Sequence, residues 1–216
     1  MPGTAARMTF MPRPEPVLKK GRLEAFSDGV LAIVITIMVL ELKVPHETEW
    51  RALLPVLPVL LSYVLSFLYV GIHWNNHHHL LAATRHVGGA VLWANLHLLF
   101  WLSLIPFVTG WMGENAFAPV PTAAYGAVLF MAAIAYAILQ RAILATEPVD
   151  SALRRELGAD LKGKLSPVLY LAAIAAALWL QPWIACALYF LVALMWIVPD
   201  RRSERAIRAR PAGDEP

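Results

Sequence analysis

An apolar run from Leu165 to Val198 constrains the fold of this chain more than any other sequence feature. Folded as one α-helix, the run would be about 50 Å long at about 1.5 Å per residue, whereas the hydrocarbon core of a bilayer is about 30 Å thick. Gln181-Pro182 lies at its middle, where proline can interrupt a helix. The run therefore predicts two short membrane spans joined by a tight turn.

Four further apolar segments precede this pair, at residues of about 23–42, 53–73, 90–110 and 121–145. We expect the second to continue as a polar-tipped helix through His79, and the third to be kinked or ended by Pro106. The chain is 59% hydrophobic and 15% charged, whereas soluble domains have about 45–50% and about 25%. The predicted fold class is therefore all-α, a polytopic membrane protein with about six transmembrane helices.

Basic residues predict how these spans are oriented. Of the 18 lysine and arginine residues, only Lys43 and Arg51 fall on one side of the predicted membrane. Positive charge next to spans favours the cytoplasm, so both termini are predicted to be cytoplasmic. The expected organisation is a cytoplasmic N-terminal segment at 1–21, a six-helix transmembrane domain at 22–200 and a basic cytoplasmic tail at 201–216. Because the basic residues lie beside spans, they indicate membrane topology and no nucleic-acid partner.

No set of residues in the sequence indicates catalysis. The chain has no Gly-rich phosphate loop, no GxSxG motif and no paired intramembrane carboxylates. His73 and His77 have an i, i+4 spacing that can bind zinc, but no Cys or Glu-x-x-His partner accompanies them. We therefore predict that the protein is not an enzyme and has no cofactor and no resident metal ion.

The first span carries an acidic group that needs a partner or a function. An ionised Asp at the centre of a span costs roughly 2.5–3.5 kcal/mol on insertion scales, and less near an end. Asp28 follows Ser27 close to the predicted cytoplasmic boundary. Two explanations fit these residues equally well. One is placement near the interface with stabilisation by the helix dipole, and the other is a functional role.

Helical geometry divides the first span into two faces. At about 100° per residue, one apolar stripe holds Phe26, Ile33, Ile37 and Leu40, and Thr36 flanks it. Arg22 extends this stripe, whereas Ser27 and Asp28 lie on the opposite side. Taken alone, such a stripe is typical of ordinary lipid contact or helix packing.

Polar residues at a similar depth occur in the next two spans. Trp74 and His77 are three residues apart on one face of the second span, and Asn95 enters the third span from the same side. We expect Trp74 and His77 to donate hydrogen bonds to a buried acceptor, with Asp28 the natural candidate. Such polar contacts bridge membrane helices for roughly 0.6–2 kcal/mol each.

These residues together resemble the transmembrane protein 175 potassium-channel family. The motifs are Arg22-x-x-x-Phe26-Ser27-Asp28, then Trp74-x-x-His77, then Asn95 followed by Ser103-Leu-Ile-Pro106-Phe107. The pattern is similar to the prokaryotic branch, which has one six-helix repeat per chain. It extends over roughly residues 22–109, about half of the sequence.

The resemblance implies a homotetramer in which the first helix of each subunit lines a central pore. It implies a pore constriction formed by Ile33, then Thr36 or Ile37, and then Leu40. Behind the pore wall it implies a support network formed by Arg22, Phe26, Ser27, Asp28, Trp74, His77 and Asn95. The helical angles place Arg22 on the pore stripe instead, so its part in this network stays open.

The function that follows is passive potassium transport by a cation channel in the plasma membrane, with K⁺ as the permeant ion and the lipid bilayer as surroundings. Two alternatives stay open. One is a proton leak or proton-coupled transporter that uses Asp28 and His77 as a relay. The other is a structural membrane subunit that transports nothing. Ion flux in liposomes distinguishes the three.

Overall fold

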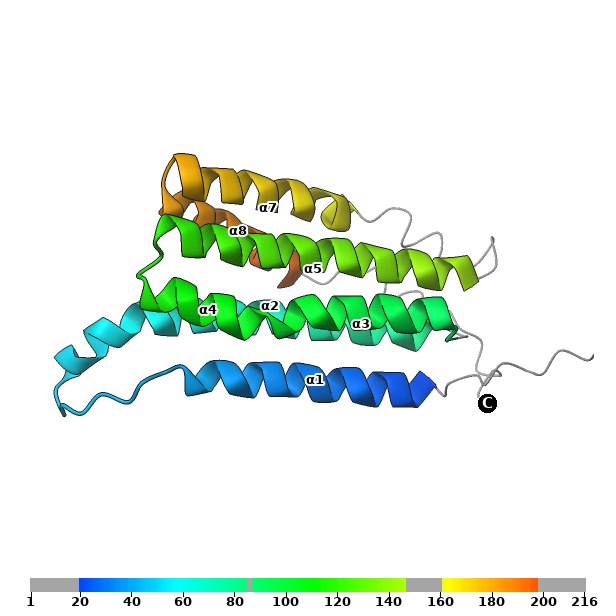
Figure 1. The fold of residues 1–216 in the computed structure, drawn as a ribbon, viewed down its shortest axis with the longest axis horizontal. Coiled ribbons are helices and arrows are strands. Elements are labelled where there is room, and N and C mark those ends of the chain that lie inside the picture. Colours follow the sequence, from blue (N-terminus) through cyan, green and yellow to red (C-terminus); the bar gives the residue numbers. More distant parts are fainter. Residues whose placement is uncertain (1–19, 85–86, 147–160, 198–216) are drawn as a thin grey trace, which may run out of the picture.

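The computed structural model describes residues 20–84, 87–146 and 161–197. They form a bundle of roughly antiparallel helices (Figure 1). The elements in chain order are α1 (Lys20–Leu40), the 3₁₀ helix η1 (Trp50–Val56), α2 (Leu57–Ala83), α3 (Gly89–Ser103), α4 (Ile105–Glu114), α5 (Pro119–Thr146), α7 (Leu161–Trp179) and α8 (Pro182–Ile197).

The bundle contains an apolar helical segment at each of the six predicted spans. Five helical segments are long and apolar enough to span a bilayer, with η1 joined to α2 and α3 joined to α4, and α8 is a shorter apolar helix of 16 residues. The predicted turn in the last apolar run is confirmed, because α7 ends at Trp179 and α8 begins at Pro182. From the turn after α7, α8 runs back toward the end of the bundle where α1 begins (Figure 1).

Prolines account for the breaks in regular α-helix within the second and third spans. Pro55 lies inside η1, so regular α-helix begins only at Leu57, and α2 continues past His79 to Ala83. The third span breaks at Leu104, between α3 and α4, because Pro106 cannot donate a backbone hydrogen bond to the preceding turn. The predicted kink is therefore present, and the span continues to Glu114 instead of ending near residue 110.

α1 lies at one edge of the bundle, and α7 lies near the opposite edge (Figure 1). The first helix packs against α2, α3 and α4. The face that makes these contacts buries Leu23, Leu31, Val34 and Met38 almost completely. Ser27 is buried as well, Val30 and Ile35 are partly buried, and most of the remaining residues of α1 are exposed on the single chain.

Buried tyrosines hold the other half of the bundle together. The Tyr69 hydroxyl donates to the Tyr189 carbonyl oxygen at 2.7 Å, and the Tyr189 hydroxyl donates to the Thr122 carbonyl oxygen at 3.1 Å. The rings of Tyr125 and Tyr170 pack against both. The Tyr125 hydroxyl accepts from Ser66 at 3.1 Å, so the hydroxyls of Tyr69, Tyr125 and Tyr189 each have a partner, as burial of a phenol in lipid requires.

The structure does not test which side of a membrane each end faces. It places both described ends, Lys20 and the C-terminal end of α8, toward the same end of the bundle (Figure 1). Most of the predicted segments 1–21 and 201–216 lie outside the described residues. The cytoplasmic location of the termini therefore stays a prediction.

We expect Gly113→Ala to destabilise the protein. A Cβ atom at Gly113 would lie 2.7 Å from the Val59 Cα atom and would overlap the Ser62 hydroxyl, so α4 could not approach α2 as it does. Overpacking of this kind costs about 1–3 kcal/mol, and thermal unfolding in detergent measures it. Gly71→Ala is the matched control, because nothing lies within 4 Å of a Cβ at that helical position. Equal unfolding midpoints for the two variants would contradict this account of the α2–α4 contact.

Candidate functional site

The predicted apolar stripe of α1 is exposed on the surface of the single chain. Ile33 is 58% exposed, Leu40 is 79% exposed, and Phe26, Thr36 and Ile37 are exposed as well. The Thr36 hydroxyl donates to the Ile33 carbonyl oxygen at 2.9 Å, so its proton is used within the helix. The stripe can contact lipid, or it can face the same stripe on other copies of the chain.

The opposite face of α1 is tied to α2 and α3 by buried polar groups. Asn95 Nδ2 donates to the Ser27 hydroxyl oxygen at 3.0 Å, and His77 Nε2 lies 2.6 Å from Asn95 Oδ1. Ser27 in turn donates to the Leu23 carbonyl oxygen at 2.9 Å. Ser27, Asn95 and His77 are all buried, and each is 2% exposed or less.

The direction of each hydrogen bond among Leu23, Ser27, Asn95 and His77 follows from which atoms can donate a proton. The Leu23 carbonyl oxygen can only accept, so Ser27 donates to it and receives the amide proton of Asn95. Asn95 Oδ1 can also only accept, so the proton between Asn95 and His77 resides on His77 Nε2. Three helices are thereby joined through side chains, and no carboxylate takes part in these bonds.

Asp28 lies beside this junction and has a different partner from His77. Trp74 Nε1 donates to Asp28 Oδ1 at 3.0 Å, and both residues are exposed on the single chain. The prediction that His77 also bonds to Asp28, as a buried acceptor, is wrong. Asn95 supplies a neutral acceptor inside the junction, which avoids the cost of burying a carboxylate there.

Two residues of the predicted support network lie apart from it. Arg22 is exposed and makes no hydrogen bond or ion pair within the described part of the chain. Phe26 is 54% exposed and belongs to the apolar stripe. The structure therefore places both on the uncovered side of α1, as the helical angles indicated for Arg22.

The histidine pair on α2 serves hydrogen bonding in this structure. His73 Nδ1 lies 2.8 Å from the Tyr69 carbonyl oxygen, to which it donates, and His77 is engaged by Asn95. Among residues 20–84, 87–146 and 161–197, no three His, Cys, Asp or Glu side chains are grouped closely enough to hold a metal ion.

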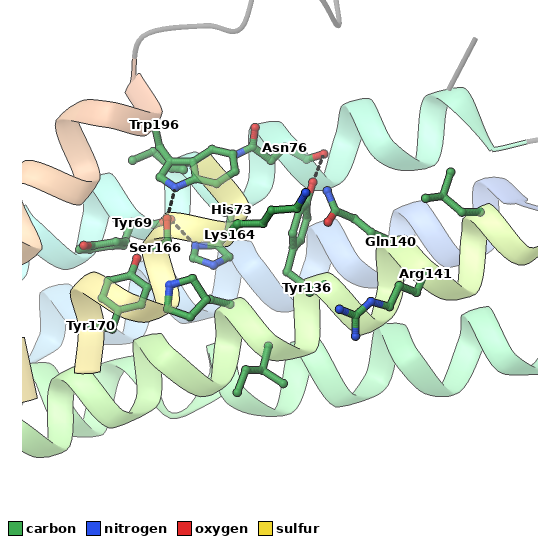
Figure 2. Close-up of a pocket in the computed structure, with 17 residues that line it drawn as sticks. Tyr69, His73, Asn76, Tyr136, Gln140, Arg141, Lys164, Ser166, Tyr170 and Trp196 are labelled. Carbon is green, nitrogen blue, oxygen red and sulfur yellow. Dashed lines mark hydrogen bonds between the residues drawn. The ribbon is translucent and has the colours of Figure 1, made fainter. Parts of the chain in front are cut away.

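A cavity that hydropathy and motifs do not predict lies on the side of α2 that faces α5, α7 and α8 (Figure 2). Arg141 and Lys164 line it. In the sequence both count only among the basic residues on the predicted cytoplasmic side. Their convergence depends on how α5 and α7 pack, which periodicity does not reveal.

Comparison with known proteins places these features in context. A family model described as "Endosomal/lysosomal potassium channel TMEM175" matches residues 22–106, the region of α1, α2 and α3 that carries the stripe and the junction. A potassium channel from Chryseobacterium sp. is 52% identical over 88% of this chain and 99% of its own length.

Two more distant relatives also carry the TMEM175 name. The crystal structure of a lysosomal potassium-selective channel TMEM175 homolog from Chamaesiphon minutus has 29% sequence identity and a TM-score of 0.71, and covers 85% of this chain and 98% of that one. The endosomal/lysosomal proton channel TMEM175 of Homo sapiens is 39% identical, over only 33% of this chain and 17% of its own length.

Trp74→Phe should lower the stability of the folded protein, because it removes the indole donor to Asp28 and keeps an aromatic ring. We expect a loss of about 0.5–1.5 kcal/mol, measured as a lower midpoint of thermal unfolding in detergent. Trp93→Phe is the matched control, since Trp93 is 75% exposed on α3 and its indole makes no hydrogen bond in the described residues. Indistinguishable midpoints for the two variants would show that the Trp74–Asp28 bond contributes nothing.

Proposed function

The chain belongs to the TMEM175 family of potassium channels, and we propose that its ion pathway is lined by the exposed stripe of α1 from several copies of the chain. It is a multi-pass membrane protein, and its activity is passive transport of K⁺ across the cell membrane. The observation that carries the proposed pathway is the division of α1 into an uncovered apolar face and a rear face held by hydrogen bonds to α2 and α3.

An ion pathway formed by α1 needs more than one chain. One helix at the edge of a bundle supplies only part of a pore wall, and the described chain encloses no channel around Ile33 or Leu40. We propose a homotetramer in which four copies of α1 surround a common axis. Closed symmetry then presents the same residues to the ion from each subunit.

The proposed constriction acts through its apolarity. Rings of Ile33, Ile37 and Leu40, with Thr36 beside them, form a narrow neck that can empty of water and block ions. Opening widens or rotates the helices so that partly hydrated ions pass. K⁺ sheds water at lower cost than Na⁺, so a tight neck favours K⁺ modestly without rings of carbonyl oxygens.

The support network fixes the rotation of α1 about its own axis, and so fixes which side chains form the neck. Ser27, through Asn95, and Asp28, through Trp74, hold one face of α1 against its own subunit. The stripe about 120–140° away around the helix then faces outward from that subunit. The proposed membrane orientation places the end with Lys20 in the cytoplasm, as the positive-inside rule favours.

Proton permeation is the second candidate, because the vertebrate relatives are named proton channels. A relay through Asp28 and His77 would need the two groups to be connected. Asp28 bonds to Trp74 and His77 bonds to Asn95, so no hydrogen-bonded path joins them in the described chain. Liposomes with a K⁺ gradient and an internal pH dye separate the candidates, because only the second makes flux depend on protons.

Ile33→Asn tests the constriction. Four amides in place of four isoleucines keep the neck wet, so we expect the K⁺ current to rise severalfold and K⁺/Na⁺ discrimination to fall. The measurement is current and reversal potential with K⁺ and Na⁺ on opposite sides of the bilayer. Ile184→Asn is the matched control, since Ile184 is 45% exposed on α8, across the bundle from α1. If currents through the Ile33 variant are unchanged, Ile33 does not line the pathway.

Asp28→Ala tests the proposed supporting role of the carboxylate. We expect fewer assembled channels or a lower open probability, with an unchanged reversal potential, because Asp28 holds α1 and does not face the ion. Asp28→Asn keeps an acceptor oxygen for Trp74 and should restore part of the loss. Size-exclusion profiles and single-channel recordings measure both effects. A change in selectivity alone would place Asp28 in the ion pathway instead.

A further inference from the structure

A short segment of the chain projects from the end of the bundle opposite the start of α1, which we call the outer end (Figure 1). This outer segment, residues 41–56, consists of the connection after α1 and the 3₁₀ helix η1. The side chains of Trp50 and Leu54 are 88% and 65% exposed, and those of Val44 and Leu53 are exposed as well. Single apolar side chains on a surface are ordinary, but a contiguous group of them marks a contact.

The register between α1 and α2 shows how far the outer segment projects. Lys20 at the start of α1 donates to the Ala82 carbonyl oxygen near the end of α2 at 2.8 Å, so the last residue of α1 lies about level with Ser62. η1 begins about twelve residues beyond Ser62, which is about 20 Å at about 1.5–2.0 Å per residue. α1 is 21 residues long, or about 31 Å, and already matches a hydrocarbon core of about 30 Å. Trp50 therefore lies past a headgroup layer of about 5–8 Å.

The structure describes every connection at the outer end. These connections are the outer segment and residues 115–118 and 180–181. The described chain breaks off only at the opposite end of the bundle, after residues 84, 146 and 197 and before residues 20, 87 and 161 (Figure 1). The outer segment is thus left uncovered by the parts of the chain that surround it.

Charged side chains of both signs flank the apolar group. Lys43 is paired with Glu114 on α4, with 3.0 Å between the two charged atoms. Glu47, Glu49 and Arg51 make no ion pair within residues 20–84, 87–146 and 161–197. An apolar group beside two free acids and one free base is complementary to a second copy of itself, because the base of one copy can pair with an acid of the next.

The outer segment directly continues the exposed face of α1. Leu40, the last residue of the apolar stripe, is 79% exposed, and the outer segment begins at the next residue. In the proposed assembly of four chains around α1, on which this inference rests, the outer segments of neighbouring copies surround the same axis. A lipid surface fits less well, because the segment carries three acidic and two basic residues, whereas helices that lie on membranes have polar faces rich in Lys and Arg.

We propose that the outer segment is a contact between neighbouring copies of this chain, outside the membrane. Trp50 and Leu54 of one copy pack against the outer segment of the next copy, and Arg51 pairs with Glu47 or Glu49 across the same boundary. Within lipid, apolar helix faces gain no hydrophobic free energy when they associate. Outside the membrane, water supplies that driving force. The contact therefore stabilises the assembly where the α1 stripe does so least, around the outer entrance of the proposed ion pathway.

The first test measures assembly of the full chain in a neutral detergent, by size-exclusion chromatography with light scattering over a dilution series. Leu54→Gln should weaken assembly about tenfold, the factor that corresponds to about 1.4 kcal/mol, because a buried Leu contributes at least that much. Leu180→Gln is the matched control, since Leu180 is 68% exposed at the same end of the bundle, in the turn between α7 and α8. Equal dissociation of the two variants would overturn the proposed contact.

Thiol accessibility tests the same surface independently. Leu54→Cys in a Cys186→Ala background gives a chain with one thiol, because Cys186 is the only cysteine in the sequence. A water-soluble maleimide should label this thiol about tenfold more slowly in the assembled protein than in single chains, whereas Leu180→Cys in the same background should react equally fast in both. If single chains in lipid nanodiscs are protected to the same degree, lipid covers the outer segment and the proposal is wrong.

Failure of this contact and failure of the proposed pathway give different results. If the protein assembles but Leu54→Cys stays as reactive as in single chains, the outer contact does not exist and the assembly around α1 stands. If the wild-type chain remains single at every concentration, the proposed homotetramer fails, and the outer contact fails with it.

Discussion

The arrangement of the first three helices depends on the buried amide of Asn95. It donates to Ser27 on α1 and accepts from His77 on α2, so one side chain of α3 fixes both neighbours. Each of the three side chains has a hydrogen-bond partner, which makes the junction tolerable in lipid, where an unpaired polar group costs several kcal/mol. Rotating α1 by about a third of a turn would bury Ile33 in place of Ser27 and break this pairing. The junction therefore determines which face of α1 is left uncovered.

The uncovered face and the held face have opposite chemical requirements. Ile33, Ile37 and Leu40 need no partner in lipid or in a dewetted neck, so their exposure costs little before assembly. Asp28 needs a donor, and Trp74 supplies it at the surface of the protomer. A helix that packed on all sides could not contribute to a shared pathway. Leaving one face free while anchoring the other allows α1 to serve assembly and ion passage together.

The second half of the bundle is organised differently. Four tyrosines hold α2, α5, α7 and α8 together through hydroxyl-to-carbonyl bonds and ring contacts. Beyond this layer, toward the basic end, the same four helices separate around the cavity lined by Arg141 and Lys164. α2 contacts α1 with one face and lines the cavity with another. It therefore lies between the proposed pore helix and the cavity.

Hydropathy and proline positions in the sequence were sufficient to determine the number of spans, the hairpin at Gln181-Pro182 and the kink near Pro106, because lipid forces each apolar segment to satisfy its backbone within a helix. Helical angles were also sufficient to separate the side of Ile33 from that of Ser27. Only the tertiary structure decided that His77 bonds to Asn95 and that Arg141 and Lys164 line one cavity. Each of those pairs joins different helices, and their meeting depends on helix rotation and tilt, which side-chain packing sets and a one-dimensional pattern does not contain.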